Sequence, residues 1–296
     1  MKVALVHHAR LPVRGYGGTE RVVVWLARGL LELGHEVTLL SAPGSAVPGV
    51  KHVPIPSKQA SRLGFDARPF IPKGIDVVHA HQEIADPGVP WFWTMHGNAR
   101  EGHVLPPNTI GLSEDHARRH GLVHWVHNGL DPDEHPFLGQ KKDFDLFLGR
   151  LHSVKGWQWA VEAARRTERK MVIAGGWRPV VSRWVRFAGT VEGQKKEALL
   201  SEARILWAPA QWDEPFGLTS IEALACGTPV LGTRRGALPE IVTPETGATG
   251  VTLEELLALI PRVEKCDPEA CRDLVQRKFH YRVMAERYVG IYQQAG

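Results

Sequence analysis

Two glutamates separated by seven residues, Glu214 and Glu222, give the strongest chemical signal in the chain. Pro215 favours an extended backbone at Glu214, and a helix is expected to begin at about Gly217. The first helical N–H groups have no intrahelical acceptor, which here predicts available amides at Phe216, Gly217 and Leu218. Glu222 lies about two turns further along, so both carboxylates could contact one elongated ligand. Carboxylates accept hydrogen bonds from vicinal hydroxyls, which a nucleotide sugar offers on its ribose and its hexose.

Glu222 has apolar or small neighbours, from Ile221 to Cys226, which indicates a largely buried helix. A buried glutamate without a partner would be costly. The alternative interpretation is an ordinary exposed helix residue.

A second pattern, residues 149–156, places two cations close together, with Arg150 at the end of a strand and Lys155 just before a helix. Arginine offers a bidentate fork and lysine a point charge, and together they can neutralise a diphosphate. The alternative is a pair of solvated surface cations. Thirteen Lys and Arg balance thirteen Asp and Glu in residues 1–138, so the net charge of +4 arises in the second half. That half is therefore the better candidate for a phosphate ligand.

A glycine-rich segment, residues 15–20, lies between an expected strand and an expected helix. Glycines allow close approach of the backbone to a ligand, and a helix N-terminus favours an anion. The segment is not a dinucleotide fingerprint, because Glu20 occupies the last glycine position, and no Gly-Lys-Ser/Thr of a Walker A loop follows. A plain tight turn explains it about equally well.

Length and composition fit a globular protein of two domains, with 296 residues, 43% hydrophobic and 23% charged. The three cysteines, Cys226, Cys266 and Cys271, form no C-x-x-C pair, which favours a reducing compartment. No secretory signal is evident, and the longest apolar stretch, residues 22–33, is too short to span a bilayer. We therefore expect a cytoplasmic protein.

Apolar strand-like runs alternate with helical patterns, which predicts parallel βαβ units and an α/β fold. The expected strands include 2–7, 37–41, 76–80, 91–95, 109–112, 145–148, 171–174, 185–187, 205–208 and 229–231. The expected helices are 19–33, 157–166, 194–203, 217–225, 253–260, 268–278 and 282–293. A polar, turn-like segment at 137–144 predicts a boundary between domains 1–138 and 139–278, followed by a C-terminal helix in 279–296.

These motifs together resemble the family 4 glycosyltransferases, which are retaining enzymes of the GT-B fold. The likeness is carried by Gly17–Glu20, Gly149–Gly156 and Glu214–Glu222, and extends through 223–230 and 239–242. It runs to about residue 242 and is faint over 45–75. The resemblance implies two Rossmann-like domains whose parallel sheets face a central cleft. It assigns 1–138 to the acceptor, 139–278 to the nucleotide-sugar donor, and the last helix to packing on the first domain.

The resemblance also implies roles for particular residues. Arg150 and Lys155 would hold the donor diphosphate, and Glu222 the ribose. Glu214 would contact the transferred sugar beside the amides of Phe216–Leu218. The remaining roles fall in the first half: His96, at a strand end, would contact the transferred sugar, and the backbone of Gly17 and Gly18 would face the leaving phosphate or the acceptor.

The implied reaction is transfer of a hexose from a UDP- or GDP-linked sugar to an acceptor hydroxyl, with retained anomeric configuration. The acceptor would be a saccharide, a lipid-linked molecule or a small molecule. We expect no cofactor and no metal, since the two cations can stabilise the leaving diphosphate. The D-x-D patterns at 131–133 and 143–145 lie at an interdomain link and a strand start, so neither is interpreted as a metal site.

Several alternatives stay open. The chain is short for the family, which leaves acceptor recognition open as well. It could be a catalytically silent nucleotide-sugar-binding protein, or a GT-B nucleotide-sugar epimerase. Residues 57–73 are expected to form a mobile loop, with contact to an anionic acceptor or to the inner face of the membrane as the second interpretation. His79 and His81 share a strand face and are expected to pair or contact a ligand. No basic stripe predicts nucleic-acid binding.

Overall fold

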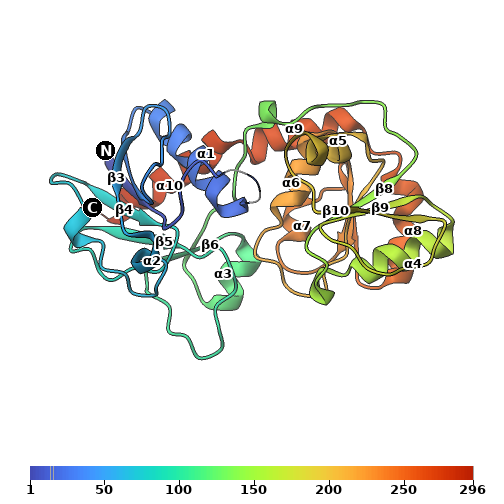
Figure 1. Ribbon diagram of the computed structural model, residues 1–296, viewed down its shortest axis with the longest axis horizontal. Helices are drawn as coiled ribbons and strands as arrows, with labels where there is room; N and C mark the ends of the chain where they lie inside the picture. Colours follow the sequence, from blue (N-terminus) through green and yellow to red (C-terminus); the bar gives the residue numbers. More distant parts are fainter. Residues whose placement is uncertain (14, 16, 296) are drawn as a thin grey trace. The chain divides into compact units, whose positions relative to one another are not determined.

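The computed structural model describes residues 1–13, 15 and 17–295, so Tyr16 of the glycine-rich segment and the preceding Arg14 lie outside the described residues. Internal contacts divide the chain into two units. The first unit combines Met1–Leu130 with the segment that begins at Phe279, and the second is Asp131–Lys278 (Figure 1). Among the described helices, none is long and apolar enough to cross a membrane.

The first unit is built on a parallel sheet of seven strands in the order β3-β2-β1-β4-β5-β6-β7. Its strands are β1 (Lys2–Val6), β2 (Glu36–Ser41), β3 (Lys51–Pro54), β4 (Val77–Ala80), β5 (Trp91–Thr94), β6 (Thr109–Gly111) and β7 (His124–Trp125). Strand β1 is buried from Val3 to Val6 and pairs with β2 on one side and β4 on the other. A continuous apolar run of this kind suits a strand that is covered on both faces.

Helices cover this sheet, and one of them comes from the end of the chain. The helical segments are α1 (Gly18–Glu32), α2 (Ser57–Ala60), α3 (Glu114–His120), α10 (Tyr281–Tyr292), η1 (Arg68–Phe70) and η4 (Gln293–Ala295). Helix α10 packs closely on α1, where a Cβ on Gly29 would lie 2.7 Å from Cβ of Ala285. The hydroxyl of Tyr281 also donates to Glu32 Oε1 at 2.6 Å.

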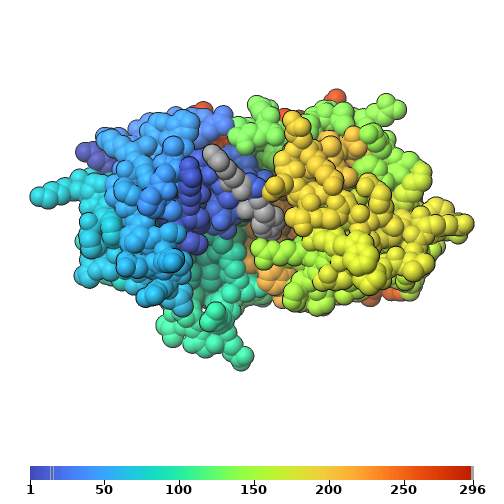
Figure 2. Space-filling model, in the orientation of Figure 1, coloured from blue at the N-terminus to red at the C-terminus, as the bar shows by residue number. Residues whose placement is uncertain are grey.

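The connection between β5 and β6 extends away from this sheet as a long loop, drawn in teal in Figures 1 and 2. Val104 in this loop is 87% exposed. By contrast, residues 57–73, expected to be a mobile loop, contain α2 and η1. Phe65 and Ala67 of this stretch are buried in the core beside β4.

The second unit repeats the design with six parallel strands in the order β10-β9-β8-β11-β12-β13. Its strands are β8 (Asp145–Leu148), β9 (Met171–Ala174), β10 (Val185–Gly189), β11 (Leu206–Ala208), β12 (Val230–Thr233) and β13 (Gly247–Gly250). Its helical segments are η2 (Pro132–Glu134), η3 (Ser153–Lys155), α4 (Trp157–Thr167), α5 (Gly193–Glu202), α6 (Leu218–Ala225), α7 (Leu238–Ile241), α8 (Leu253–Val263) and α9 (Pro268–Lys278). The core gathers Phe147, Ile173, Trp207 and Leu231 from four of the strands.

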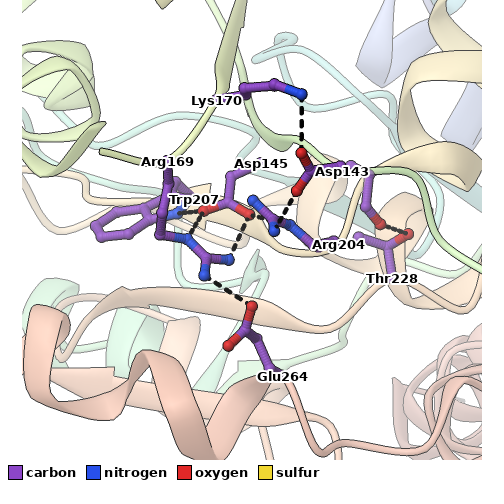
Figure 3. Close-up of polar contacts among 9 residues, drawn as sticks. Asp143, Asp145, Arg169, Lys170, Arg204, Trp207, Thr228 and Glu264 are labelled. Carbon is purple, nitrogen blue, oxygen red and sulfur yellow. Dashed lines mark hydrogen bonds and ion pairs between the residues drawn. The ribbon is translucent and has the colours of Figure 1, made fainter. Parts of the chain in front are cut away.

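A network of ion pairs closes the amino end of β8 (Figure 3). Asp145 is fully buried, and its two oxygens accept from Arg169 at 2.8 and 2.9 Å. Asp143, which is exposed, pairs with Lys170 at 2.9 Å and with Arg204 at 2.7 Å. Both carboxylates of this D-x-D pattern are therefore engaged in ion pairs that fix the start of the strand.

The predicted α/β architecture with two parallel sheets is confirmed, but the division of the chain differs from the expected boundary at 138/139. Residues from Asp131 onward belong to the second unit. Asp133 accepts from Arg272 at 3.1 Å, and His135 Nδ1 lies 2.8 Å from Glu197 Oε2. The amide of Leu138 donates to the carbonyl of Cys226 at 3.4 Å. These long-range contacts attach residues 131–138 to the second unit, so the boundary lies before the polar segment at 137–144.

Candidate active site

The carboxyl edge of the second unit's sheet gathers the loops that follow β8, β9 and β11, since parallel strands all end at the same edge. The loop after β8 lies against the loop after β9. The amide of Gly149 donates to the carbonyl of Ala174 at 3.0 Å, and a Cβ on Gly175 would lie 2.6 Å from the carbonyl carbon of Gly149. Arg150 follows directly and is exposed at this edge.

The loop after β8 also lies against the loop after β11, and this contact brings two predicted residues together. The amide of Gln211 donates to the carbonyl of Val154 at 2.7 Å. Gly156, at φ 72°, packs so closely on Pro209 that a Cβ would collide with its carbonyl group. As a result, Lys155 Nζ lies 2.6 Å from Glu214 Oε1, although the two residues are 59 positions apart.

The pair is half-buried, with 28% of the Lys155 side chain and 30% of the Glu214 side chain exposed. The ammonium of Lys155 also lies 5.0 Å from the ring centroid of Trp212, within the range of a cation–π contact. Trp212 was not singled out from the sequence. Its position two residues before Glu214 in the same loop is the only signal that could have indicated this contact.

The backbone around Glu214 is fixed by a close approach of a second loop. The amide of Ala237 donates to the carbonyl of Glu214 at 3.0 Å. Gly217 adopts the left-handed region at φ 96° and caps α6, which begins at Leu218, one residue later than expected. Phe216 is buried. The first N–H groups of α6 have no intrahelical acceptor, and the loop that carries Glu214 leads directly into this end of the helix.

Glu222 lies in α6 and is 2% exposed, which confirms a buried position and excludes the exposed-helix alternative. Its Oε1 accepts from Lys196 Nζ at 2.7 Å, so the buried carboxylate has a cationic partner. Lys196 lies in α5 and was not anticipated. The only available signal was its place in the helix expected at 194–203, because a sequence does not show which helices pack together.

The predicted residues of the first unit lie at two loops of its own sheet. Gly17 caps α1 and Gly18 is its first residue. A Cβ on Gly17 would come within 2.8 Å of both the Glu20 carboxylate and the Val13 side chain. The backbone there is extended, at φ 171°, so glycine is favoured by space and not by a left-handed conformation.

His96 follows β5 and pairs with His81, which follows β4, through a contact of 2.9 Å between His96 Nε2 and His81 Nδ1. His79 lies beside them and contacts Tyr292 Oη at 2.6 Å and Thr94 Oγ1 at 2.7 Å. His79 and His81, which were expected to pair or to contact a ligand, therefore both contact side chains of the first unit. Burial lowers the pKa of His79 and of His96 to about 3, so both are neutral at pH 7.

By distance alone, one group among the described residues could hold a metal ion. His135, Glu197 and Cys226 each offer a ligand atom within 4.8 Å of the others. However, Glu197 already pairs with His135 and lies 3.6 Å from the ammonium of Lys196. Burial raises the pKa of the Cys226 thiol to about 12, and a metal would have to displace its proton. We interpret the group as a hydrogen-bonded ion-pair cluster.

The structure thus brings Lys155 and Glu214 into direct contact and places Glu222 on the helix that follows. Arg150 lies on the same loop as Lys155. Gly17, Gly18 and His96 belong to the first unit, where His96 contacts His81 and the glycines begin α1.

Two family profiles match successive parts of the chain. The profile described as Glycosyltransferase Family 4 matches residues 16–131, and that described as Glycosyl transferases group 1 matches residues 145–265. A phosphatidyl-myo-inositol mannosyltransferase of Propionibacterium freudenreichii subsp. shermanii is 26% identical over 300 residues, which cover 80% of this chain and 78% of that protein.

One solved structure supports the same assignment, and a second shares the fold. AviGT4, a glycosyltransferase involved in avilamycin A biosynthesis, superposes with a TM-score of 0.82 at 30% identity and covers 99% of this chain and 97% of its own. The Anabaena protein HepE, solved in complex with UDP, has a TM-score of 0.69 at 13% identity, with 99% of this chain and 100% of that chain covered. The second likeness concerns the fold alone. The predicted GT-B fold of this chain is thereby confirmed.

Proposed function

We propose that this chain, which belongs to the family 4 glycosyltransferases, moves a hexose from a UDP- or GDP-linked sugar to an acceptor hydroxyl with retention of anomeric configuration. The observation that carries the proposal is the pairing of Lys155 with Glu214 at 2.6 Å at the carboxyl edge of the second sheet. In open α/β sheets this edge is where ligands bind.

The diphosphate is the first group that the proposal assigns. Arg150 and Lys155 come from one loop, and Arg150 is exposed while Lys155 is half-buried. Negative charge grows on the leaving diphosphate as the glycosidic bond breaks, and fixed cations stabilise that charge. The N-terminus of α6 adds backbone N–H groups at Gly217 and Leu218, beside Phe216. With these groups in place, we propose that no metal ion is required.

The two glutamates bind the neutral parts of the donor in this proposal. Glu214, in the loop before α6, accepts from hydroxyls of the transferred hexose. Glu222, within α6, accepts from the ribose hydroxyls. The contact between Lys155 and Glu214 keeps both side chains oriented before the donor binds.

From the first unit we assign His96 to the transferred sugar and the backbone of Gly17 and Gly18 to the leaving phosphate or the acceptor. The low pKa of His96, about 3, makes it a neutral hydrogen-bonding group and not a cation at pH 7. In its contact with His81 one ring donates and the other accepts, so the tautomers of the two histidines are coupled.

The proposal is tested by incubating the protein with UDP-glucose, UDP-galactose, GDP-mannose and related donors, together with saccharide, polyprenyl-phosphate and small alcohol acceptors. Mass spectrometry detects the product, and NMR of the anomeric proton reports its configuration. Lys155→Gln should lower turnover about a hundredfold, in the range found for single charge-stabilising groups. Lys170→Gln, which removes an exposed lysine paired with Asp143, serves as the matched control.

The outcomes separate the alternatives. Acceptor-dependent transfer that persists in EDTA supports the proposal. Release of free nucleoside diphosphate without acceptor, together with an altered sugar, identifies an epimerase. Binding of a nucleotide sugar without turnover on any acceptor identifies a binding protein. Transfer with inverted configuration contradicts the proposed stereochemistry.

A further inference from the structure

We propose that Lys196 is a positioning residue that holds the buried carboxylate of Glu222 in the orientation that recognises the ribose of the donor. This inference rests on the proposed function, because it assumes that Glu222 binds the ribose of a nucleotide donor. The two residues come from neighbouring helices, α5 and α6, and are 26 positions apart.

The contact is short and well shielded from water. Lys196 Nζ lies 2.7 Å from Glu222 Oε1, and the side chains are 12% and 2% exposed. A carboxylate at this depth is stable in its charged form only with a cation or several donors beside it. A carboxylate has two oxygens and about four acceptor positions. A lysine held on Oε1 therefore restricts the rotation of the group.

Lys196 also lies near a second carboxylate, that of Glu197. Its ammonium lies 3.6 Å from Oε1 of Glu197, and the other oxygen of Glu197 lies 2.8 Å from His135 Nδ1. A lysine side chain has a flexible stem, so a second carboxylate reduces the number of positions that it can occupy. The chain of contacts runs from His135 through Glu197 and Lys196 to Glu222.

A purely structural ion pair would show the same contacts, and only ligand recognition separates the two interpretations. If Lys196 orients Glu222 for the ribose, its loss should weaken binding of a ribonucleotide much more than binding of the matching 2′-deoxyribonucleotide. A structural pair would affect both ligands equally, through the stability of the unit.

The experiment measures binding of UDP and 2′-deoxy-UDP, and of GDP and 2′-deoxy-GDP, by isothermal titration calorimetry. The wild type should prefer the ribonucleotide of its own base by about tenfold or more, the value of a hydrogen bond to a charged group. In Lys196→Met this preference should fall to nearly one, mainly through a weaker affinity for the ribonucleotide. Lys196→Arg, which retains the cation, should restore most of the preference.

The matched control is Lys142→Met, which removes another lysine–glutamate pair of the same unit, formed with Glu202 at 2.6 Å. It should leave the preference unchanged. Should Lys196→Met fail to fold, Lys196→Gln keeps a hydrogen-bond donor without the charge, and the same fall in preference is expected there.

Each outcome has a distinct meaning. A wild type that binds no nucleotide contradicts the proposed function itself. A wild type that binds the ribo and deoxy forms equally contradicts the role of Glu222, and with it this inference. A wild type that prefers the ribonucleotide, with the same preference retained in a folded Lys196→Met or Lys196→Gln variant, overturns the inference alone.

Discussion

Replacement of Gly156 by alanine should disable the donor site through the backbone, without removing any functional side chain. Gly156 has φ 72°, and a Cβ there would lie 2.7 Å from the carbonyl carbon of Pro209 and closer still to its oxygen. Ordinary contact begins at 3.4 Å, so the loop that carries Lys155 must move away from the loop that carries Glu214. We expect that movement to lengthen their contact of 2.6 Å and to misplace Lys155 relative to Glu214.

The expected loss has two parts. A left-handed alanine costs about 1–2 kcal/mol on its own. Forcing a methyl group into a filled site adds about 1–3 kcal/mol, because the surrounding backbone has to shift. A displacement of about 1 Å in a catalytic loop can lower turnover about a hundredfold. Gly156→Ala should therefore lose about 2–5 kcal/mol of unfolding free energy and about two orders of magnitude in sugar transfer.

Gly189→Ala in the same unit is the matched control. Gly189 has φ 73°, and a Cβ added there would have no described atom within 4 Å, so alanine meets only the backbone cost. Urea unfolding and steady-state transfer would be measured on both variants and the wild type. Equal losses in the two variants would refute the reasoning, because the packing of Gly156 on Pro209 would then contribute nothing.

The ion pairs and the buried histidines lead to three further predictions. Asp145→Asn should cost about 1–3 kcal/mol in urea unfolding, because it removes the buried carboxylate that Arg169 and Arg204 share and leaves Arg169 with Glu264 alone. Exposed Asp143→Asn should cost clearly less, and similar values for the two would contradict the burial argument. Burial lowers the pKa of His79 from 6.5 to about 3, so neutral His79 leaves the free energy of unfolding undiminished above pH 6.5. As the pH falls toward 3 that free energy decreases, by about 2 kcal/mol between pH 7 and 5. His79→Gln should flatten that part of the urea-midpoint profile, and an unchanged slope would count against a neutral His79. Glu214→Gln should change the unfolding free energy by less than about 1 kcal/mol but lower transfer about a hundredfold; a loss of stability without loss of transfer would mark Glu214 as structural.

The sequence predicted the fold class and the local motifs because both depend on short-range patterns. Alternating apolar runs and helical spacing specify βαβ units, and all-parallel pairing follows from that alternation. The contact between Lys155 and Glu214 could have been predicted, because each residue follows a strand and the carboxyl ends of parallel strands share one edge.

The remaining features depend on tertiary packing. Lys196 meets Glu222 only because α5 and α6 pack together, and no local pattern encodes that choice. Strand β13, with the sequence Gly-Ala-Thr-Gly, has low strand propensity and is held by its pairing with β12. The boundary between the two units lies earlier than predicted, because residues after Asp131 contact Glu197 and Arg272, which lie far along the chain.

The central claim is that the second unit binds a nucleoside diphosphate through Arg150, Lys155 and Glu222. A crystal structure of the protein with UDP or GDP, whichever raises its melting temperature more, tests it most directly. We predict phosphate oxygens within hydrogen-bond distance of Arg150 and Lys155, and a ribose hydroxyl on the Glu222 carboxylate. A nucleotide bound elsewhere, with these three side chains making no contact to it, would contradict the account.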